Sequence, residues 1–470
     1  MNIVNHIRDE TRLVAQKTAI VEGERAITYQ QLLDRAHVLS VALSGRGVRT
    51  GQCIAFRCRD GIDYVIGALA LLEIGAAVVP LADSLTECET TEIIQRIDVA
   101  GILTHRDLPH GSAETLDDLF YWQPRAGSVE LEHRCRELGA AFIRFSSGTT
   151  GESKGVVLSH RSILDRTDAA DRGLAVTDQD VILWVLGMSH HFVVSILLFL
   201  RRGATIIVAN GNFPFSFLDA ATRFPITLIY ASPVHYYLLA ASDSIAPQSL
   251  AHVRLAISTA MKLPREVREQ FAEKFGIVPA EAYGIIEVGL PFINTDADPT
   301  SPNSVGRLLP DYQMRIANPD SDGVGEVLLR GKGMFDAYVS PWRFRDECLQ
   351  DGWFATGDLG RLDQHGRLTL LGRSKTVIIC AGMKIFPEEV EEVIDAFPGV
   401  VESLVSGRDH PQFGQTPVAD VVLAANITES AAVLAGLRAH CCRVLSSYKV
   451  PLEFRQAVSL VKTASGKLRR

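Results

Sequence analysis

The stretch RFSSGTTGESKG, residues 144–155, follows an apolar segment, residues 140–143, that is typical of a buried strand. Residues 146–155 hold five hydroxyl side chains, three glycines and one lysine, Lys154. Glycines let main-chain N–H groups approach an anion closely, while hydroxyls and a lysine add donors and charge. The composition therefore favours a loop that binds a polyphosphate.

The spacing of this loop excludes the two commonest nucleotide-binding patterns. A GxxxxGK[ST] loop would need a second glycine where Ser153 stands, and here Gly155 follows Lys154. The GxGxxG pattern of dinucleotide sites is also missing. A P-loop kinase is thus disfavoured. On composition alone, a flexible polar surface loop remains an alternative.

The regions around the loop alternate between helical and strand patterns. Helical spacing covers residues 29–43 and 64–74, and apolar strand-like runs cover 53–56, 77–80, 181–186, 205–208, 228–230 and 255–258. From about residue 303, short strands separated by Pro, Gly and Asp indicate a β-rich subdomain, and residues 376–470 repeat a strand–helix pattern of their own. We expect an α/β protein with a large N-terminal domain of layered α/β sheets (1–372, β-rich part about 303–372) and a small, mobile C-terminal α+β domain (376–470).

Composition narrows the class of protein. The chain has 470 residues, 47% of them hydrophobic and 22% charged, with a net charge of −8, and the absence of a basic footprint argues against a nucleic-acid scaffold. Eight scattered cysteines without a CxxC pair indicate reduced thiols, and we expect a cytoplasmic location.

Residues 181–200 carry no formal charge and are long enough to be tested as a transmembrane segment. Polar residues at their centre argue against it, so we expect a strand at 181–186 and a helix at 193–200.

Six motifs together resemble the adenylate-forming superfamily of acyl- and aryl-CoA synthetases, luciferases and peptide-synthetase adenylation domains. In family order they are LEIGAAVVP (72–80), SSGTTGESKG (146–155), EAYGIIE (281–287), WFATGD (353–358), GRSK (372–375) with Gly382 and PEEVE (387–391), and KTASGK (462–467). Because the motifs extend over most of the chain, the resemblance outweighs the surface-loop interpretation of residues 146–155.

The resemblance implies ATP-dependent activation of a carboxylic acid to an acyl-adenylate with release of pyrophosphate. It assigns phosphate binding to Ser146, Ser147, Gly148, Thr149, Thr150, Gly151 and Lys154, and the adenine surroundings to Ser258, Thr259, Ala260, Met261, Ala282, Tyr283 and Gly284. Glu287 would ligate Mg²⁺, Asp358 and Arg373 would bind the ribose, and Lys467 would bridge the carboxylate and the α-phosphate. Catalytic roles therefore fall on Lys467, Glu287 and His191.

Two positions depart from the family pattern. Ile286 stands where the family has a threonine, and Val461 where it has a proline. Losing one hydrogen bond to the phosphate costs on the order of 1 kcal/mol, so we expect a lower rate rather than no activity. The same departures motivate an alternative of another class, a degenerate homologue that binds a nucleotide or acyl ligand without turnover.

The substrate is expected to be an acid without an α-amine, either aromatic or aliphatic. Family members that use amino acids hold the ammonium with an aspartate in the stretch corresponding to residues 187–195, and no Asp or Glu occurs between Asp180 and Asp219 here. The pocket would be lined by His190, His191, Tyr230, Ser232, Val234, Tyr237, Ile285 and Leu290. His191 is favoured over His190 at the carboxylate.

The resemblance also implies a second step at a thiol. The C-terminal domain would rotate about a hinge at residues 373–375, which includes Lys375, and bring the loop at Gly382 to a pantetheine arm. We expect CoA as acceptor, with the phosphopantetheine of an acyl carrier protein as the alternative. The predicted requirements are therefore ATP, Mg²⁺ and CoA.

Overall fold

The computed structural model describes residues 2–83, 85, 87–109, 113–145, 154–209, 211–295, 304–380, 383–410, 413–425, 427, 430–462 and 468. They form two compact units. The first takes the described residues up to 145 together with 154–313 and 330–354, and the second takes 314–329 and those from 355 onward. Part of the β-rich segment thus clusters with the C-terminal residues, and the predicted hinge at 373–375 stays a prediction.

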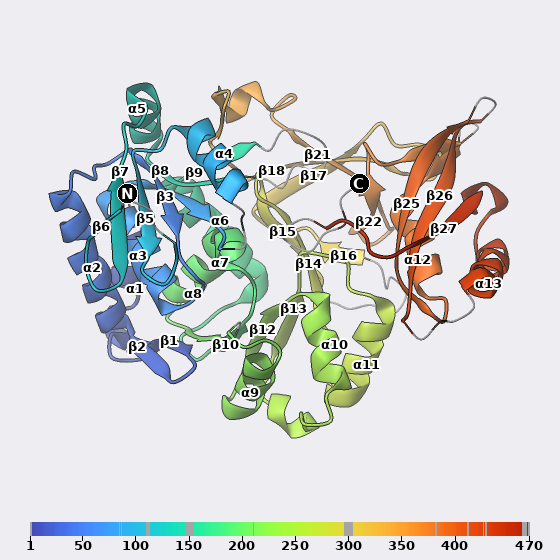
Figure 1. The fold of residues 1–470 in the computed structure, drawn as a ribbon, viewed down its shortest axis with the longest axis horizontal. Helices are drawn as coiled ribbons and strands as arrows, with labels where there is room; N and C mark the ends of the chain where they lie inside the picture. The colour runs from blue at the N-terminus through green and yellow to red at the C-terminus, as the bar shows by residue number, and fades with distance from the viewer. Residues whose placement is uncertain are drawn as a thin grey trace. The chain divides into compact units, whose positions relative to one another are not determined.

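The first unit contains two mixed sheets (Figure 1). Neighbouring strands of one sheet are, in order, β15 (Gly289–Ile293), β14 (Ala280–Ile285), β13 (Leu255–Ser258), β12 (Leu228–Ala231), β10 (Val181–Trp184), β11 (Thr205–Val208), β1 (Thr18–Glu22) and β2 (Arg25–Thr28). Those of the other are β20 (Arg343–Phe344), β19 (Ala337–Val339), β9 (Gly155–Ser159), β8 (Ala140–Phe145), β4 (Ala77–Leu81), β3 (Cys53–Arg57), β5 (Gly101–His105), β7 (Phe120–Pro124) and β6 (Glu114–Thr115). A short strand, β16 (Ser304–Arg307), follows β15 in the chain.

The helices of the first unit are α1 (Ile3–Glu10), α2 (Tyr29–Gly45), α3 (Ile62–Ile74), α4 (Glu87–Ile97), α5 (Val129–Leu138), α6 (His160–Leu174), α7 (Met188–His191), α8 (Leu197–Arg201), α9 (Phe215–Arg223), α10 (Pro233–Ala241) and α11 (Arg265–Phe275). Most of them pack against the two sheets, whereas α1 packs on the helices α3, α6 and α8. Local sequence explains several boundaries. Thr28 and Gln31 form a capping box at the start of α2, and α3 ends at Gly75, whose φ of 82° favours glycine.

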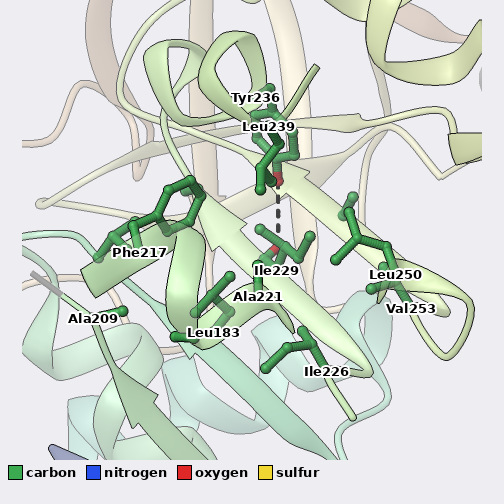
Figure 2. Close-up of a cluster of buried hydrophobic side chains, with 14 of the residues drawn as sticks. Leu183, Ala209, Phe217, Ala221, Ile226, Ile229, Tyr236, Leu239, Leu250 and Val253 are labelled. Carbon is green, nitrogen blue, oxygen red and sulfur yellow. Dashed lines mark hydrogen bonds between the residues drawn. The ribbon is translucent and has the colours of Figure 1, made fainter. Parts of the chain in front are cut away.

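A buried cluster beside the first sheet joins its strands to the helices that cover one face (Figure 2). Phe217, Ile229, Tyr236, Leu239 and neighbouring apolar side chains from α9, β12 and α10 are all buried. The Tyr236 hydroxyl satisfies its donor at the main chain, 2.7 Å from the oxygen of Ile257. This packing holds the parallel strands β10, β12, β13 and β14 in fixed register, and these strands position the candidate site.

The second unit contains two further β structures. In one sheet β22 (Arg367–Arg373), β21 (Phe354–Leu362), β18 (Gly325–Gly331) and β17 (Tyr312–Ala317) are neighbours in that order. In the other, β24 (Met383–Ile385), β23 (Ile378–Cys380), β26 (Gly414–Leu423) and β25 (Val400–His410) follow one another, with β27 (Glu453–Ala457) paired to β26 and helices α12 (Pro387–Asp395) and α13 (Ser430–Val444) packed on them.

One predicted element differs in type. The helix expected over residues 193–200 is a π-helix at Phe192–Ile196 followed by α8. The hydroxyl of Ser195 donates to the carbonyl of His191, which places a side chain in the local hydrogen-bond ladder. The widened turn directly follows the two histidines that the sequence places in the substrate pocket.

No helix in the described part of the chain is long and apolar enough to cross a membrane.

Candidate active site

Parallel strands bring several predicted residues to one edge of the first sheet. The neighbouring strands β14, β13, β12 and β10 are parallel, so their carboxyl ends meet along one edge. The segments that leave this edge carry His190 and His191 after β10, Ser232 after β12, Thr259 after β13 and Glu287 after β14. In open α/β sheets, ligands bind outside the carboxyl ends of the strands. The sheet therefore gathers the predicted acyl-pocket and adenine residues at the position where a ligand is expected.

The predicted phosphate loop is reached through strands β8 and β9. Ser146, Ser147, Gly148, Thr149, Thr150 and Gly151 lie outside the described residues, as do Gly382 and Lys467. Phe145 and Gly155 are antiparallel partners, so the ends of the loop are adjacent. A Cβ on Gly155 would lie 2.3 Å from Cγ1 of Val339, so glycine is required for β19 to pack here.

Lys154 and Glu287 meet on the side chain of Tyr338 in β19. The Lys154 ammonium lies 5.1 Å from the centre of the Tyr338 ring, a cation–π geometry. The Tyr338 hydroxyl donates to Oε1 of Glu287 at 3.1 Å. Tyr338 itself is buried, and burial followed by the nearby Glu287 charge raises the pKa of its hydroxyl, which therefore stays a hydrogen-bond donor. We call Lys154, Glu287 and Tyr338 the Tyr338 cluster.

Main-chain bonds hold the segment of Glu287 against the turn that leads to β19. Phe335 N–H donates to the Glu287 carbonyl at 2.7 Å. The buried guanidinium of Arg166 donates to the Ile286 carbonyl at 3.0 Å and to the Gly333 carbonyl at 2.6 Å. Burial lowers the pKa of Arg166 to about 10, so it remains charged at neutral pH. Arg166 thus ties the end of β14 to the turn before β19 through their carbonyl oxygens.

The two histidines lie beside a second buried arginine. His190 Nδ1 is 2.8 Å from the Ser189 hydroxyl, and its carbonyl accepts from Arg144. His191 packs edge-on against Trp184, with 6.3 Å between ring centres. Burial lowers the pKa of Arg144 to about 10, and Glu287 is the first of the nearby charges that oppose this shift. Arg144 therefore connects the end of β8 to the turn that carries His190 and His191, which we call the histidine corner.

An aspartate from a distant part of the chain also contacts this corner. The carboxylate of Asp60 accepts from the Met188 N–H at 3.0 Å. The stretch between Asp180 and Asp219 contains no acidic residue, so the sequence did not indicate a carboxylate at this position. Asp60 comes from a separate part of the chain, just before α3. By accepting this main-chain N–H, the Asp60 carboxylate stabilises the turn that carries the two histidines.

The ends of β12 and β13 place the remaining predicted residues. Tyr230 is buried, stacks on Trp184 with 5.6 Å between ring centres, and has its pKa raised to about 12 by burial. Ser258 is buried and its hydroxyl has no hydrogen-bond partner within the described part of the chain. Ala260 has a φ of 74°, a left-handed conformation that costs energy for alanine and is typical of binding turns. A buried hydroxyl without a protein partner, beside a strained turn, can donate to a polar ligand.

The other pocket residues differ in exposure. Leu290 is buried, Ala282, Tyr283 and Ile285 on β14 are partly buried, and Gly284 is exposed. Ser232 caps α10, with its hydroxyl 2.8 Å from Nδ1 of His235. Val234 and Tyr237 are 47% and 50% exposed on the outer part of α10. Their assignment to the acyl pocket stays a prediction.

In the second unit, the predicted ribose residues form an ion pair. Asp358 and Arg373 are partners across β21 and β22, and Arg373 Nε lies 2.8 Å from the Asp358 carboxylate. The TGD segment of β21 is held by Thr356, whose hydroxyl accepts the Asp358 N–H at 3.0 Å and donates to the Val327 carbonyl. Lys375 is exposed, two residues beyond β22. Each carboxylate oxygen offers two lone pairs, so a carboxylate paired with arginine can still accept bonds from ribose hydroxyls.

Sequence reasoning missed Tyr338, Arg144, Arg166 and Asp60. Tyr338 and Asp60 lie in no recognised motif. Arg144 and Arg166 carried a signal, because a charge inside or next to a buried apolar segment normally needs a partner. Their partners are carbonyl oxygens, which no residue pattern marks.

Comparison with known families and proteins identifies the class. Residues 8–339 match the AMP-binding enzyme family and residues 389–467 match the AMP-binding enzyme C-terminal domain. The chain belongs to this family, and the predicted superfamily is confirmed.

Individual relatives cover almost the whole chain. The sulfoacetate–CoA ligase of Cupriavidus necator is 29% identical over 96% of this chain and 92% of its own. A 2-succinylbenzoate–CoA ligase of Bacillus cereus is 28% identical over 99% and 97%. The ATP-bound structure of MatB from Rhodopseudomonas palustris has 25% identity and a TM-score of 0.84 over 100% of this chain and 97% of that one. The predicted fold class is confirmed.

Proposed function

We propose that the chain activates a carboxylic acid with ATP to an acyl-adenylate and transfers the acyl group to the thiol of CoA. Membership of the AMP-binding family and relatives that are CoA ligases confirm the predicted class, an AMP-forming acid–thiol ligase. The observation that carries the proposal is the Tyr338 cluster, which holds a carboxylate and an ammonium on one buried ring. An ammonium can neutralise charge on the phosphates directly, and a protein carboxylate can hold a Mg²⁺ ion that would do the same, while the carboxylate of the acid attacks.

The first step is written as a displacement at the α-phosphate. A carboxylate oxygen of the acid forms a bond to phosphorus, and the bond to pyrophosphate breaks. We assign the phosphates to residues 146–154, the ribose to Asp358 and Arg373, and the developing charge between carboxylate and phosphate to Lys467. In the second step the CoA thiol gives its proton to solvent, its sulfur forms a bond to the acyl carbon, and the bond between that carbon and the phosphate oxygen breaks, so that AMP leaves.

Mg²⁺ fits the surroundings of Glu287. Mg²⁺ is normally bound by one or two carboxylates together with substrate phosphates rather than by a cage of protein ligands. Within the described residues, no group of three or more His, Cys, Asp or Glu side chains could hold a metal. Glu287 Oε1 accepts from Tyr338, and its carboxylate is only partly buried. We propose Glu287 as the protein ligand, with the ion neutralising phosphate charge when bound.

The substrate is proposed to be an acid without an α-amine, held near His191 with Tyr230 and Leu290 among the walls. Two relatives are named for acids with a second anionic group, sulfoacetate and 2-succinylbenzoate, so such acids belong beside simple aromatic and aliphatic ones. No comparison supports a carrier protein as acceptor. The cytoplasmic location stays a prediction.

Pyrophosphate exchange into ATP with a panel of acids tests the first step. We expect exchange with one or more simple or anionic acids and none with α-amino acids. Each active acid is then offered with CoA and with phosphopantetheinylated carrier protein, and thioester is expected only with CoA. Exchange that depends solely on an amino acid would contradict the substrate assignment, and no exchange with any acid would favour the non-catalytic binder.

A further inference from the structure

The Tyr338 side chain has no role of its own in the two reaction steps proposed above. Its hydroxyl reaches Oε1 of Glu287, while its ring lies under the Lys154 ammonium. The three residues come from distant parts of the chain. A contact between side chains that lie on different segments fixes their relative positions only where the segments themselves are rigid.

The frame around Tyr338 is rigid. Its ring packs on the buried ring of Phe335 with 4.7 Å between centres. Strand β19 is paired with β9, where Tyr338 is opposite Val156, two residues after Lys154. The Asp336 carboxylate accepts the Ser159 N–H at 2.6 Å, which fastens the same two strands once more. The hydroxyl therefore has little freedom to follow Glu287 if that carboxylate turns.

Metal ligands depend on such contacts. Groups that hydrogen-bond to a ligating side chain set its orientation, and removing them typically costs 10–100-fold in metal affinity. Mg²⁺ is demanding because it requires near-octahedral geometry. A hydrogen bond from Tyr338 to Oε1 of Glu287 fixes the orientation of the carboxylate and therefore the direction in which Oε2 points.

We propose that Tyr338 is a positioning residue that orients the Glu287 carboxylate for Mg²⁺ through its hydroxyl and places the Lys154 ammonium through its ring. The inference rests on the proposed function, because it takes Glu287 as the metal ligand. It separates two contributions of one side chain, the hydroxyl acting on the metal and the ring acting on the lysine.

Tyr338→Phe and Tyr338→Leu separate these contributions. Phenylalanine keeps the ring and should raise the Mg²⁺ concentration for half-maximal pyrophosphate exchange about tenfold, with the KM for the acid unchanged. Leucine removes the ring as well and should also raise the KM for ATP. Tyr236→Phe is the matched control, because it removes a buried hydroxyl that donates only to main-chain oxygens. It should leave both constants unchanged.

A binding measurement makes the result independent of turnover. Calorimetry with α,β-methylene-ATP at graded Mg²⁺ should show that Tyr338→Phe needs about ten times more Mg²⁺ for the same affinity, and that Glu287→Gln cancels this difference. If the wild type binds the nucleotide with Mg²⁺ but never exchanges pyrophosphate, the proposed function fails, and a tenfold higher Mg²⁺ requirement of Tyr338→Phe in calorimetry would still support the role of Tyr338. Equal Mg²⁺ dependence in Tyr338→Phe and wild type, or no Mg²⁺ dependence in the wild type, would overturn the inference.

Discussion

At the scale of single residues, the chemistry depends on a few charges whose surroundings differ. Glu287 and Lys154 share a buried aromatic ring, whereas Asp358 is paired with Arg373 across two strands. Lys467 lies outside the described residues, and its assignment rests on the motif KTASGK. It is nevertheless the residue whose removal best separates an enzyme from a binder.

Lys467→Ala is expected to lower the rate of pyrophosphate exchange roughly 100- to 1,000-fold, because a preorganised charge at the reacting phosphate is lost. ATP binding should change little. Lys462→Ala is the control, since it removes a nearby charge that pairs with Glu402. An equal loss in both variants would indicate that only the tail charge matters, and unchanged exchange in Lys467→Ala would refute the assignment.

At the scale of elements, the turn that leads to β19 decides where Glu287 lies. Gly333 has a φ of 72°, and a Cβ there would lie 2.3 Å from the main-chain nitrogen of Arg166. This close approach lets Arg166 bond both the Gly333 and Ile286 carbonyls. A larger residue must push α6 away from the turn and move the strand end that carries Glu287.

Gly333→Ala is therefore expected to destabilise the protein by roughly 2–4 kcal/mol, from a strained φ together with overpacking. It should also raise the Mg²⁺ requirement. Gly352→Ala isolates the strain, because its φ of 78° is similar but nothing lies within 4 Å of an added Cβ. Thermal and urea unfolding of both variants measure the difference. Equal destabilisation would show that the packing against Arg166 contributes nothing.

At the scale of the whole molecule, buried histidines in the first unit limit its stability in acid. His160 is buried at the start of α6 with Nδ1 accepting the Ile3 N–H at 3.3 Å, and His235 is buried beside Ser232. Burial lowers the pKa of each to about 4 from an ordinary 6.5. The folded state thus binds a proton less readily than the unfolded state, and its stability is lost as pH falls below 6.5 towards 4.

We expect the melting temperature to fall between pH 6.5 and pH 4, with each histidine contributing on the order of 2–3 kcal/mol. His160→Asn keeps an acceptor for the Ile3 N–H but does not titrate, so the slope should become shallower. His252→Asn, at an exposed position, is the control. The same slope in His160→Asn and wild type would contradict the role of His160.

Much of this protein was predictable from local sequence. The elements around residues 29–43, 64–74 and 255–258 follow from apolar spacing and from caps such as Thr28 and Gly75, which act within a few residues. The family follows from six short motifs, several of which carry residues that chemistry on ATP requires. The π-helix after His191 was not predictable, because the Ser195 hydroxyl that bonds to the carbonyl of His191 has no periodic signature.

What the sequence by itself determined is the family, the α/β class and the residue types needed for adenylation. Only the tertiary structure decided that Tyr338 bonds Glu287, that Arg166 joins Ile286 to Gly333, and that Asp60 meets Met188. These contacts join residues 50 to about 170 positions apart, and two of the three end on main-chain atoms, which every residue carries. Local sequence cannot encode such pairings, because they exist only once strands and helices have packed.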